Sequence, residues 1–222
     1  MRKLKYINLV VSFLIAFTLL SCSKGKDAVA VDLGYDYYPL AVGNEWVYDV
    51  ESTEYNTLGT ETSVYQLKEV IAEEVDGGDE KNFLVYRFKR ADETKEWAQD
   101  SVWSVKKETN YLVKTENNVR YQKIAFPVSL NLSWDGNVWN TSEENTYKIV
   151  SLGTAYLLNT IEYPDVLEVE HKVERNLILT NDNRERYAKA IGLIEIYNEN
   201  TEAQPGKNKL GSTYHQVLKS HK

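Results

Sequence analysis

The 222-residue chain has one cysteine, one methionine and four prolines. A single cysteine excludes a disulfide scaffold, a thiolate zinc cluster and a Cys-x-x-Cys redox pair. So little proline, beside 16 tyrosines and 5 tryptophans, argues against a disordered chain. The formal net charge of −7 argues against nucleic acid as a partner, because a nucleic-acid binder normally presents a basic face. The length fits one ordinary domain or two small ones.

The N-terminus has the features of a secretory signal. Arg2, Lys3 and Lys5 form a positive segment, and residues 7–20 form an apolar run. This run is shorter than the roughly 20 apolar residues that a membrane-spanning helix needs. We therefore expect a cleaved signal peptide. Its type depends on the lone cysteine, Cys22.

Leu19-Leu20-Ser21-Cys22 resembles the bacterial lipobox, in which a small residue precedes an acylated cysteine. The resemblance implies diacylglyceryl modification of Cys22, cleavage before it and N-acylation afterwards, which together give a stable membrane anchor. The alternative is an ordinary signal peptide followed by a chance cysteine. Cleavage would remove three positive charges, so that the mature side chains carry −10 instead of −7. The segment after Cys22 lacks the aspartate typical of an inner-membrane retention signal, so we expect the outer membrane, at its periplasmic or cell-surface face.

We predict three segments in the chain. Residues 1–21 form the lipoprotein signal peptide, and residues 22–35, which are polar or small, form a flexible tether from the lipidated cysteine. Residues 36–222 form a single β-rich domain, since no linker, low-complexity run or repeat interrupts them.

Apolar residues in this domain mostly recur at every second position, which predicts strands. The clearest case is residues 165–175, where Leu167, Val169 and His171 share one face and Glu and Lys side chains fill the other. Further alternating, β-branched or aromatic runs occur at 46–50, 83–88, 102–106, 119–126, 147–149, 193–197 and 214–218. Residues 63–75 suit either a long strand, which we favour, or a helix.

Turn residues separate these runs at short intervals, notably at 76–78, 116–118, 135–136 and 181–183. Many strands at hairpin spacing with few helical signals predict a mainly β fold. We expect a single antiparallel, strongly curved sheet or half-barrel with at most one or two short helices.

Four motifs resemble those of uncharacterised Bacteroidetes-type secreted lipoproteins. In this sequence they run from Tyr37-Tyr38-Pro39-Leu40 to Trp46-Val47-Tyr48, from Trp97 to Asn118, from Phe126-Pro127 through Trp134-Asp135-Gly136-Asn137 to Asn140, and from Tyr187 to Leu193. The resemblance implies a lipid-anchored β domain of unknown function. The fold that we expect is similar to the half-barrel of lipoprotein-carrier domains.

Motifs for catalysis or cofactor binding are missing. There is no Gly-x-Ser-x-Gly, no His-Glu-x-x-His and no glycine-rich phosphate loop, so we expect no cofactor and no metal. His171 could be a buried general base, but a buried histidine with a satisfied hydrogen bond is the simpler interpretation. A hydrolase using Asp135, Glu168 or Glu170 would need two facing carboxyls in a cleft, one with a raised pKa. We expect Glu168 and Glu170 instead on a solvated strand face.

The tryptophans are the least ordinary feature. Candidate binding residues are Trp97, Trp103, Trp134 and Trp139, whose rings could stack on a sugar or line an apolar cavity. The alternative is that these rings fill the core. We therefore expect a non-enzymatic lipoprotein that binds an apolar or acyl group, a glycan or an envelope protein. The rival functions are an envelope or polysaccharide hydrolase and a structural subunit of an envelope complex.

Overall fold

The computed structural model describes residues 32–76 and 81–222, of which Leu33–Lys222 belong to one compact unit. The predicted signal peptide and Cys22 lie outside the described residues. The unit contains one 3₁₀ helix, η1 (Tyr35–Tyr37), and a 12-stranded sheet. Its strands are β1 (Glu45–Asn56), β2 (Gly59–Asp76), β3 (Lys81–Arg90), β4 (Ala98–Lys107), β5 (Tyr111–Glu116), β6 (Val119–Ala125), β7 (Ser133–Asp135), β8 (Thr146–Leu158), β9 (Ile161–Arg175), β10 (Leu179–Ala188), β11 (Gly192–Glu202) and β12 (Leu210–His221).

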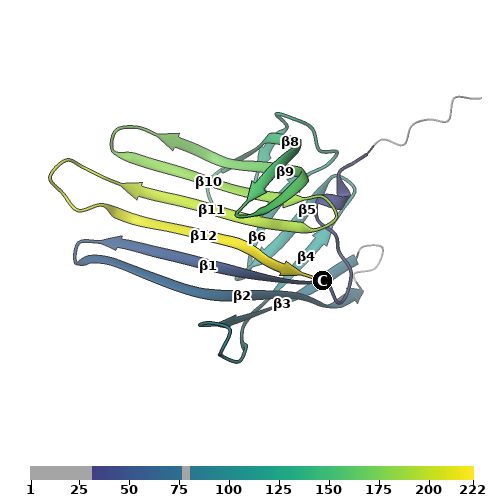
Figure 1. Cartoon of the computed structure of the whole chain (residues 1–222). Coiled ribbons are helices and arrows are strands. Elements are labelled where there is room, and N and C mark those ends of the chain that lie inside the picture. Colours follow the sequence, from purple (N-terminus) through teal and green to yellow (C-terminus); the bar gives the residue numbers. More distant parts are fainter. Residues whose placement is uncertain (1–31, 77–80) are drawn as a thin grey trace, which may run out of the picture. The chain divides into compact units, whose positions relative to one another are not determined.

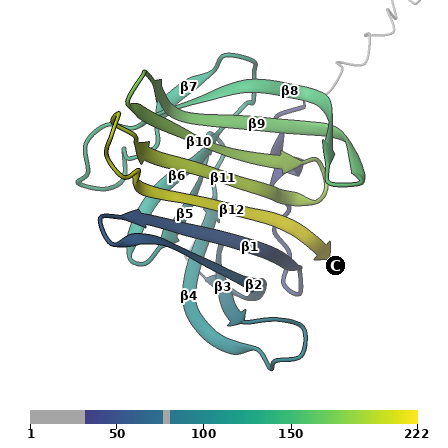
Figure 2. The same ribbon diagram turned by 60° about the vertical axis from the view of Figure 1, so that its left-hand side comes forward.

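Each strand of the sheet pairs antiparallel with its neighbours in sequence, except that β6 and β7 do not pair with each other, and β1 also pairs with β12. The order is therefore β6-β5-β4-β3-β2-β1-β12-β11-β10-β9-β8-β7. Figure 2 shows β8 to β12 followed by β1 and β2 across the front, with β3 to β6 behind them. The predicted single, strongly curved antiparallel sheet is confirmed.

The two ends of the sheet meet at a seam between β6 and the segment around β7. The main-chain N–H of Gln122 donates to the carbonyl of Gly136 at 2.9 Å, and the indole of Trp134 donates to the carbonyl of Gln122 at 2.8 Å. The amide of Asn140 donates to the carbonyl of Arg120 at 2.8 Å. These contacts make the curled sheet nearly closed.

The strand predictions agree with the structure, including the strand over residues 63–75, so the helical alternative for that segment is wrong. The turn at 116–118 is also confirmed, because Asn117 and Asn118 both have positive φ. The turn expected at 181–183 is wrong, since these residues lie within β10 and pair with β9 and β11. The hairpin turn falls earlier, after β9, where the side chain of Asn176 accepts hydrogen bonds from the next loop residues.

The hydrophobic core fills one end of the concave side. Tyr48, Leu67, Ile124 and Leu167 are among its most buried members. Tyr38, directly after η1, packs into the same cluster. No helix among the described residues is long and apolar enough to cross a membrane.

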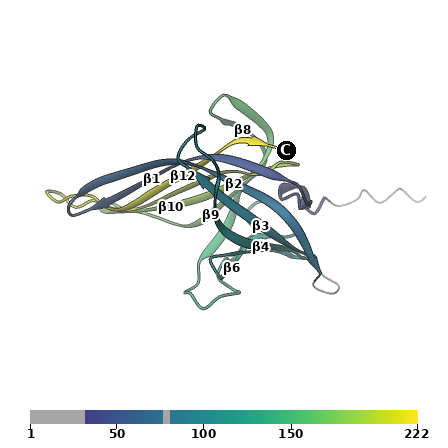
Figure 3. The ribbon, with the colours of Figure 1, turned by 90° about the horizontal axis from the view of Figure 1, so that it is seen from below.

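The opposite end of the sheet is formed by long hairpins. β1–β2, β9–β10 and β11–β12 extend past the shorter strands β3 to β6, as Figures 1 and 3 show. The concave side is therefore closed by the core at one end and flanked by extended hairpins at the other.

Candidate functional site

A cavity of about 360 Å³ lies on the concave side of the sheet, between the core and the extended hairpins. Every strand from β2 to β6 and from β8 to β12 contributes to its wall. Its lining residues are Tyr38, Glu69, Arg87, Trp103, Lys114, Glu116, Tyr121, Lys123, Tyr147, His171, Glu185, Tyr187, Leu193, Ile196, Asn198, Tyr214 and Gln216. The volume is at the lower end of the roughly 300–1,000 Å³ usual for ligand sites, so it suits a small ligand.

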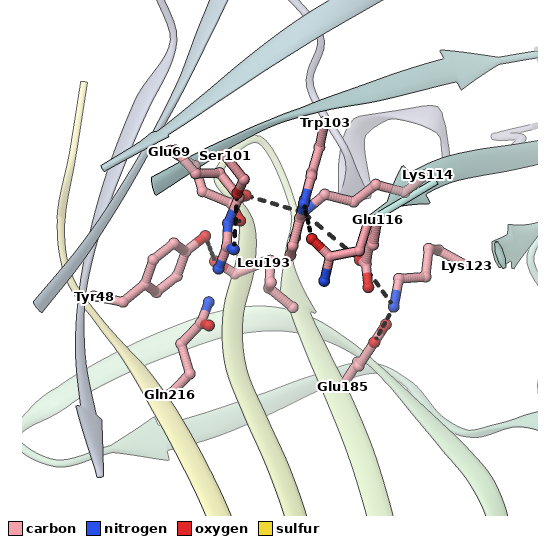
Figure 4. A network of polar contacts seen from close by, with 12 residues as sticks. Tyr48, Glu69, Ser101, Trp103, Lys114, Glu116, Lys123, Glu185, Leu193 and Gln216 are labelled. Atoms are coloured by element: carbon pink, nitrogen blue, oxygen red, sulfur yellow. Dashed lines mark hydrogen bonds and ion pairs between the residues drawn. The ribbon is translucent and has the colours of Figure 1, made fainter. Parts of the chain in front are cut away.

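Ion pairs run along one wall of the cavity, as Figure 4 shows. Glu69 accepts hydrogen bonds from the Arg87 Nε and from the Lys114 Nζ, both at 3.0 Å. All three side chains are nearly buried. Burial alone would raise the pKa of Glu69, but Lys114 and Arg87 outweigh this effect and lower it. Glu69 therefore stays ionised and is fully paired.

The chain of ion pairs continues across the cavity through Lys123. Its Nζ lies 3.3 Å from Glu116 on β5 and 2.6 Å from Glu185 on β10. Burial opposes ionisation of Glu185, yet Lys123 holds the pKa of this carboxyl at about 2. Glu185 also accepts a hydrogen bond from the Tyr187 hydroxyl. The three cations and three carboxylates of the wall thus balance one another.

Three other polar atoms of the lining lack a hydrogen-bond partner among the described residues. They are His171 Nε2, Asn198 Oδ1 and Gln216 Nε2, contributed by β9, β11 and β12. Gln216 is 2% exposed, so its amide is also shielded from bulk solvent. A buried polar group without a partner costs about 1–3 kcal/mol, and it is a natural place for a ligand to form a hydrogen bond.

His171 is neutral at physiological pH. Burial is the main cause, and it lowers the pKa of this imidazole to about 4. The ring stacks on Tyr147 with centroids 3.7 Å apart and an interplanar angle of 3°. Its Nε2 lies 3.7 Å from Glu185, which is too far for a hydrogen bond. The Nε2 of His171 therefore lines the cavity without a hydrogen-bond partner among the described residues.

The four candidate tryptophans lie in three different places. Trp103 lines the cavity, with the Arg87 guanidinium 3.6 Å from its ring centroid. Trp97 packs between Lys68 and Arg90 on the convex face. Trp134 and Trp139 lie at the seam. The indole of Trp134 donates to the main-chain carbonyl of Gln122, and the indole of Trp139 donates to the side-chain oxygen of the same residue. Only Trp103 shares a site with the unpaired polar atoms.

The carboxylates considered for hydrolysis are held by other groups. Glu168 accepts from Arg184 at 2.7 Å and from Arg186 at 2.9 Å, and Glu170 lies 2.8 Å from Arg184. The expected solvated face is thus a half-buried ladder of ion pairs, because β10 places arginines directly opposite these glutamates. Asp135 accepts hydrogen bonds from two loop N–H groups.

Hydrolysis would also require a carboxyl with a raised pKa. Among the described residues, each carboxyl whose pKa departs from its ordinary value has it lowered; these are Glu69, Asp92, Glu93, Asp182, Glu185, Glu195 and Glu199. A carboxyl with a raised pKa, which the hydrolase alternative would need as its general acid, is therefore not found among the described residues.

Neither a family model nor a curated protein matches the sequence. Three solved structures resemble the fold. One is described as an exported protein with a YmcC-like fold from Bacteroides fragilis, with 11% identity, a TM-score of 0.49 and coverage of 83% of this chain and 98% of that one. The second is described as a lipoprotein from Parabacteroides distasonis, with 10% identity, a TM-score of 0.43 and coverage of 84% and 98%.

The third structure is described as an outer membrane lipoprotein-sorting protein domain from Vibrio parahaemolyticus. It has 10% identity, a TM-score of 0.20 and coverage of 81% of this chain and 85% of that one. Of the three proteins, the first is thus described as exported and the second as a lipoprotein.

Proposed function

We propose that the protein is a non-enzymatic binding protein that holds a small, uncharged, polyhydroxylated ligand of the saccharide type in the cavity. The observation that carries the proposal is the convergence of three unpaired polar atoms, on His171, Asn198 and Gln216, around one space. Planar amide and imidazole groups bind sugar hydroxyls well, because they offer donors and acceptors in fixed directions.

The aromatic content of the lining supports the same class of ligand. One tryptophan and five tyrosines line the cavity, whereas its aliphatic side chains are Leu193 and Ile196. The faces of aromatic rings can cover the apolar faces of a sugar, as the indole of Trp103 could. An acyl chain, the other class that the sequence predicts, would bury the three unpaired polar atoms without giving them a partner.

The paired charges of the wall favour an uncharged ligand. Arg87, Lys114 and Lys123 are each engaged by a carboxylate, so an anionic ligand would have to break an existing ion pair. Breaking a buried pair leaves an uncompensated charge and is strongly unfavourable. A neutral ligand needs no such rearrangement.

A binding panel tests this proposal. The mature full-length protein, held in a polyoxyethylene detergent, would be titrated with neutral monosaccharides and disaccharides, with glucuronate and with palmitate, while tryptophan fluorescence and heat are recorded. We expect saturable binding of at least one neutral sugar and loss of the fluorescence change in Trp103→Phe. Selective binding of palmitate or glucuronate would overturn the proposal, as would a lack of binding to every sugar.

We also propose that the protein is anchored in the outer membrane through lipid on Cys22. The lipobox-like sequence supports the anchor, and the negative charge of the mature side chains, which anionic lipid would repel, makes acylation the main attachment. Metabolic labelling with an alkynyl fatty acid should mark the wild-type protein and not Cys22→Ala. Density-gradient separation should place the labelled protein in the outer membrane, and recovery in the inner membrane would contradict the location.

A further inference from the structure

The concave face continues beyond the cavity as a row of small polar residues. Asn198 and Tyr214 line the cavity and are register partners on β11 and β12. Asn183 is paired with Asn198, Ser52 with Tyr214, and Ser63 with Ser52. Directly opposed residues on neighbouring strands point to the same side of a sheet. The row therefore crosses five strands on the concave side.

A second polar row lies one step further from the core. Asn200 and Ser212 are register partners, each two residues along from a member of the first row, so they share its face. The side chains of Asn183 and Asn200 exchange two hydrogen bonds of 3.0 Å. Each amide still has a second N–H and a second lone pair to offer. We call these two rows the polar platform; its members are Ser52, Ser63, Asn183, Asn198, Asn200, Ser212 and Tyr214.

The platform and the cavity form one continuous path with a closed end. Tyr38, Tyr187 and Leu193 line the cavity and are at most 6% exposed, because they belong to the core. On the platform side, Asn200 and Ser63 are exposed to solvent, on hairpins that extend past β3 to β6 (Figure 3). A ligand would therefore enter across the platform and stop at the core.

We propose that the platform is a second subsite, which binds the following units of a neutral saccharide chain whose terminal unit occupies the cavity. This inference rests on the proposed function of the cavity and adds that the site recognises a chain end. Side-chain amides and hydroxyls supply adaptable hydrogen bonds, and Tyr214 supplies a rigid ring at the junction.

The charges around the platform favour an uncharged chain. Glu54 and Glu61 are register partners, Glu54 also pairs with Ser212, and both glutamates are exposed at the outer border of the platform. Cations also lie near Ser63: Lys89, whose Nζ lies 3.6 Å from the ring centroid of Tyr65, and Lys95. The two border carboxylates, Glu54 and Glu61, disfavour an acidic polymer at the outer end of the platform.

A chain-length series tests the second subsite. Linear neutral oligosaccharides of one to six units, from α-1,4-glucan, β-1,4-glucan and β-1,4-mannan, would be titrated into the mature full-length protein. For the series that binds, we expect affinity to rise from one to about three units and then level off. A double variant, Asn200→Ala with Ser63→Ala, should weaken binding of the longer chains about tenfold, as expected for two lost hydrogen bonds, and leave the monosaccharide unchanged.

A matched control lies on the opposite face of the same strands. Glu51 and Val64 are register partners, and both are exposed. Glu51 directly precedes Ser52, and Val64 directly follows Ser63. Glu51→Ala with Val64→Ala should leave every affinity unchanged, and thermal melting would verify that both double variants are folded.

The outcomes separate the subsite from the cavity. Binding of a monosaccharide with no gain from added units would overturn the platform subsite and leave the cavity's function intact. Equal weakening of short and long chains by the platform variant would also overturn it. A lack of binding to every neutral sugar would overturn the function of the cavity itself, and preferential binding of an acidic oligosaccharide would contradict the assignment of a neutral chain.

Discussion

Lys123 on β6 and Glu185 on β10 face each other across the concave side, with the Lys123 Nζ 2.6 Å from the Glu185 Oε1. Both residues are at most 7% exposed. β6 is the first strand in the sheet order. It pairs with β5 on one side, and on its other side it forms no strand pairing with β7 across the seam. The ion pair therefore connects the end of the curled sheet to its opposite wall, and it does so inside the cavity.

Removal of one partner should destabilise the protein strongly. Lys123→Met leaves Glu185 buried without its cation, which typically costs about 3–5 kcal/mol of unfolding free energy. Lys123→Met combined with Glu185→Gln should recover much of that loss, because no charge then remains uncompensated at Glu185. Urea denaturation of the two single variants and the double variant measures the coupling.

A surface lysine provides the control for this cycle. Lys219 is exposed and pairs with Asp49 and Glu93, so Lys219→Met should change stability by less than about 1 kcal/mol. An additive cycle, in which the double variant loses the sum of the single losses, would show that Lys123 and Glu185 do not act as a pair.

The stability of the protein should fall on mild acidification because of His171. Its pKa is about 4 in the folded state against 6.5 ordinarily, so between these values the unfolded chain binds a proton that the native state does not. Stability is therefore lost as the pH falls from about 6.5 to 4, by up to about 3 kcal/mol for this group. Urea denaturation at several pH values between 7.5 and 4 should show the slope in the wild type and a flatter profile in His171→Gln.

The neighbours of His171 separate its contribution from theirs. Lys123 stays charged over this range, and the lowered pKa of Glu185 adds its own loss of stability only below about pH 4.5. His221→Gln, at the exposed end of β12, should keep the wild-type slope. Parallel pH profiles for the wild type and His171→Gln would contradict the assignment.

Gln216 should contribute more to binding than to stability. Its Nε2 is buried without a partner, but its Oε1 accepts a hydrogen bond of 2.6 Å from the Tyr214 hydroxyl. Gln216→Met, which has a similar volume, removes both the unpaired amide and this acceptor, so it should change the unfolding free energy of the unliganded protein by less than about 1 kcal/mol. The same change removes an amide from the cavity and should weaken sugar binding about tenfold. Thermal melts without ligand and titrations with ligand measure the two effects. A variant that loses stability and keeps its affinity would argue for a structural role only.

Most of the strands could be predicted from sequence because alternation is a local property. Leu167 and Val169 lie on one face of the strand and Glu168 on the other. The two-residue period assigns these faces without knowledge of the partner strand. What those faces contact could not be predicted in the same way. Glu168 faces Arg186 only because of the register between β9 and β10, and register depends on the turn and the shift between Asn181 and Asn183.

The charged lining of the cavity could not be predicted, for a related physical reason. On β5, Lys114 follows the completely buried Leu112 by two residues, so both side chains point to the same face of the sheet. A lysine that points into a core is not expected unless a carboxylate lies beside it. Its partner Glu69 is 45 residues earlier in the sequence, so the pair could not be recognised from the local pattern. The four candidate tryptophans are close together in sequence, but of these only Trp103 lines the cavity.

Two tryptophans should therefore respond differently to the same substitution. Trp103→Phe removes the indole beside Arg87 and Lys114 in the cavity, and it should reduce sugar affinity at least about fivefold through the loss of stacking area, with a small effect on folding. Trp134→Phe removes the hydrogen bond to the Gln122 carbonyl at the seam, and it should lower stability by about 1 kcal/mol without changing affinity. Calorimetric titration and urea denaturation of both variants give the comparison. Because the two substitutions are chemically identical, a loss of affinity in Trp134→Phe alone would move the binding site from the cavity to the seam.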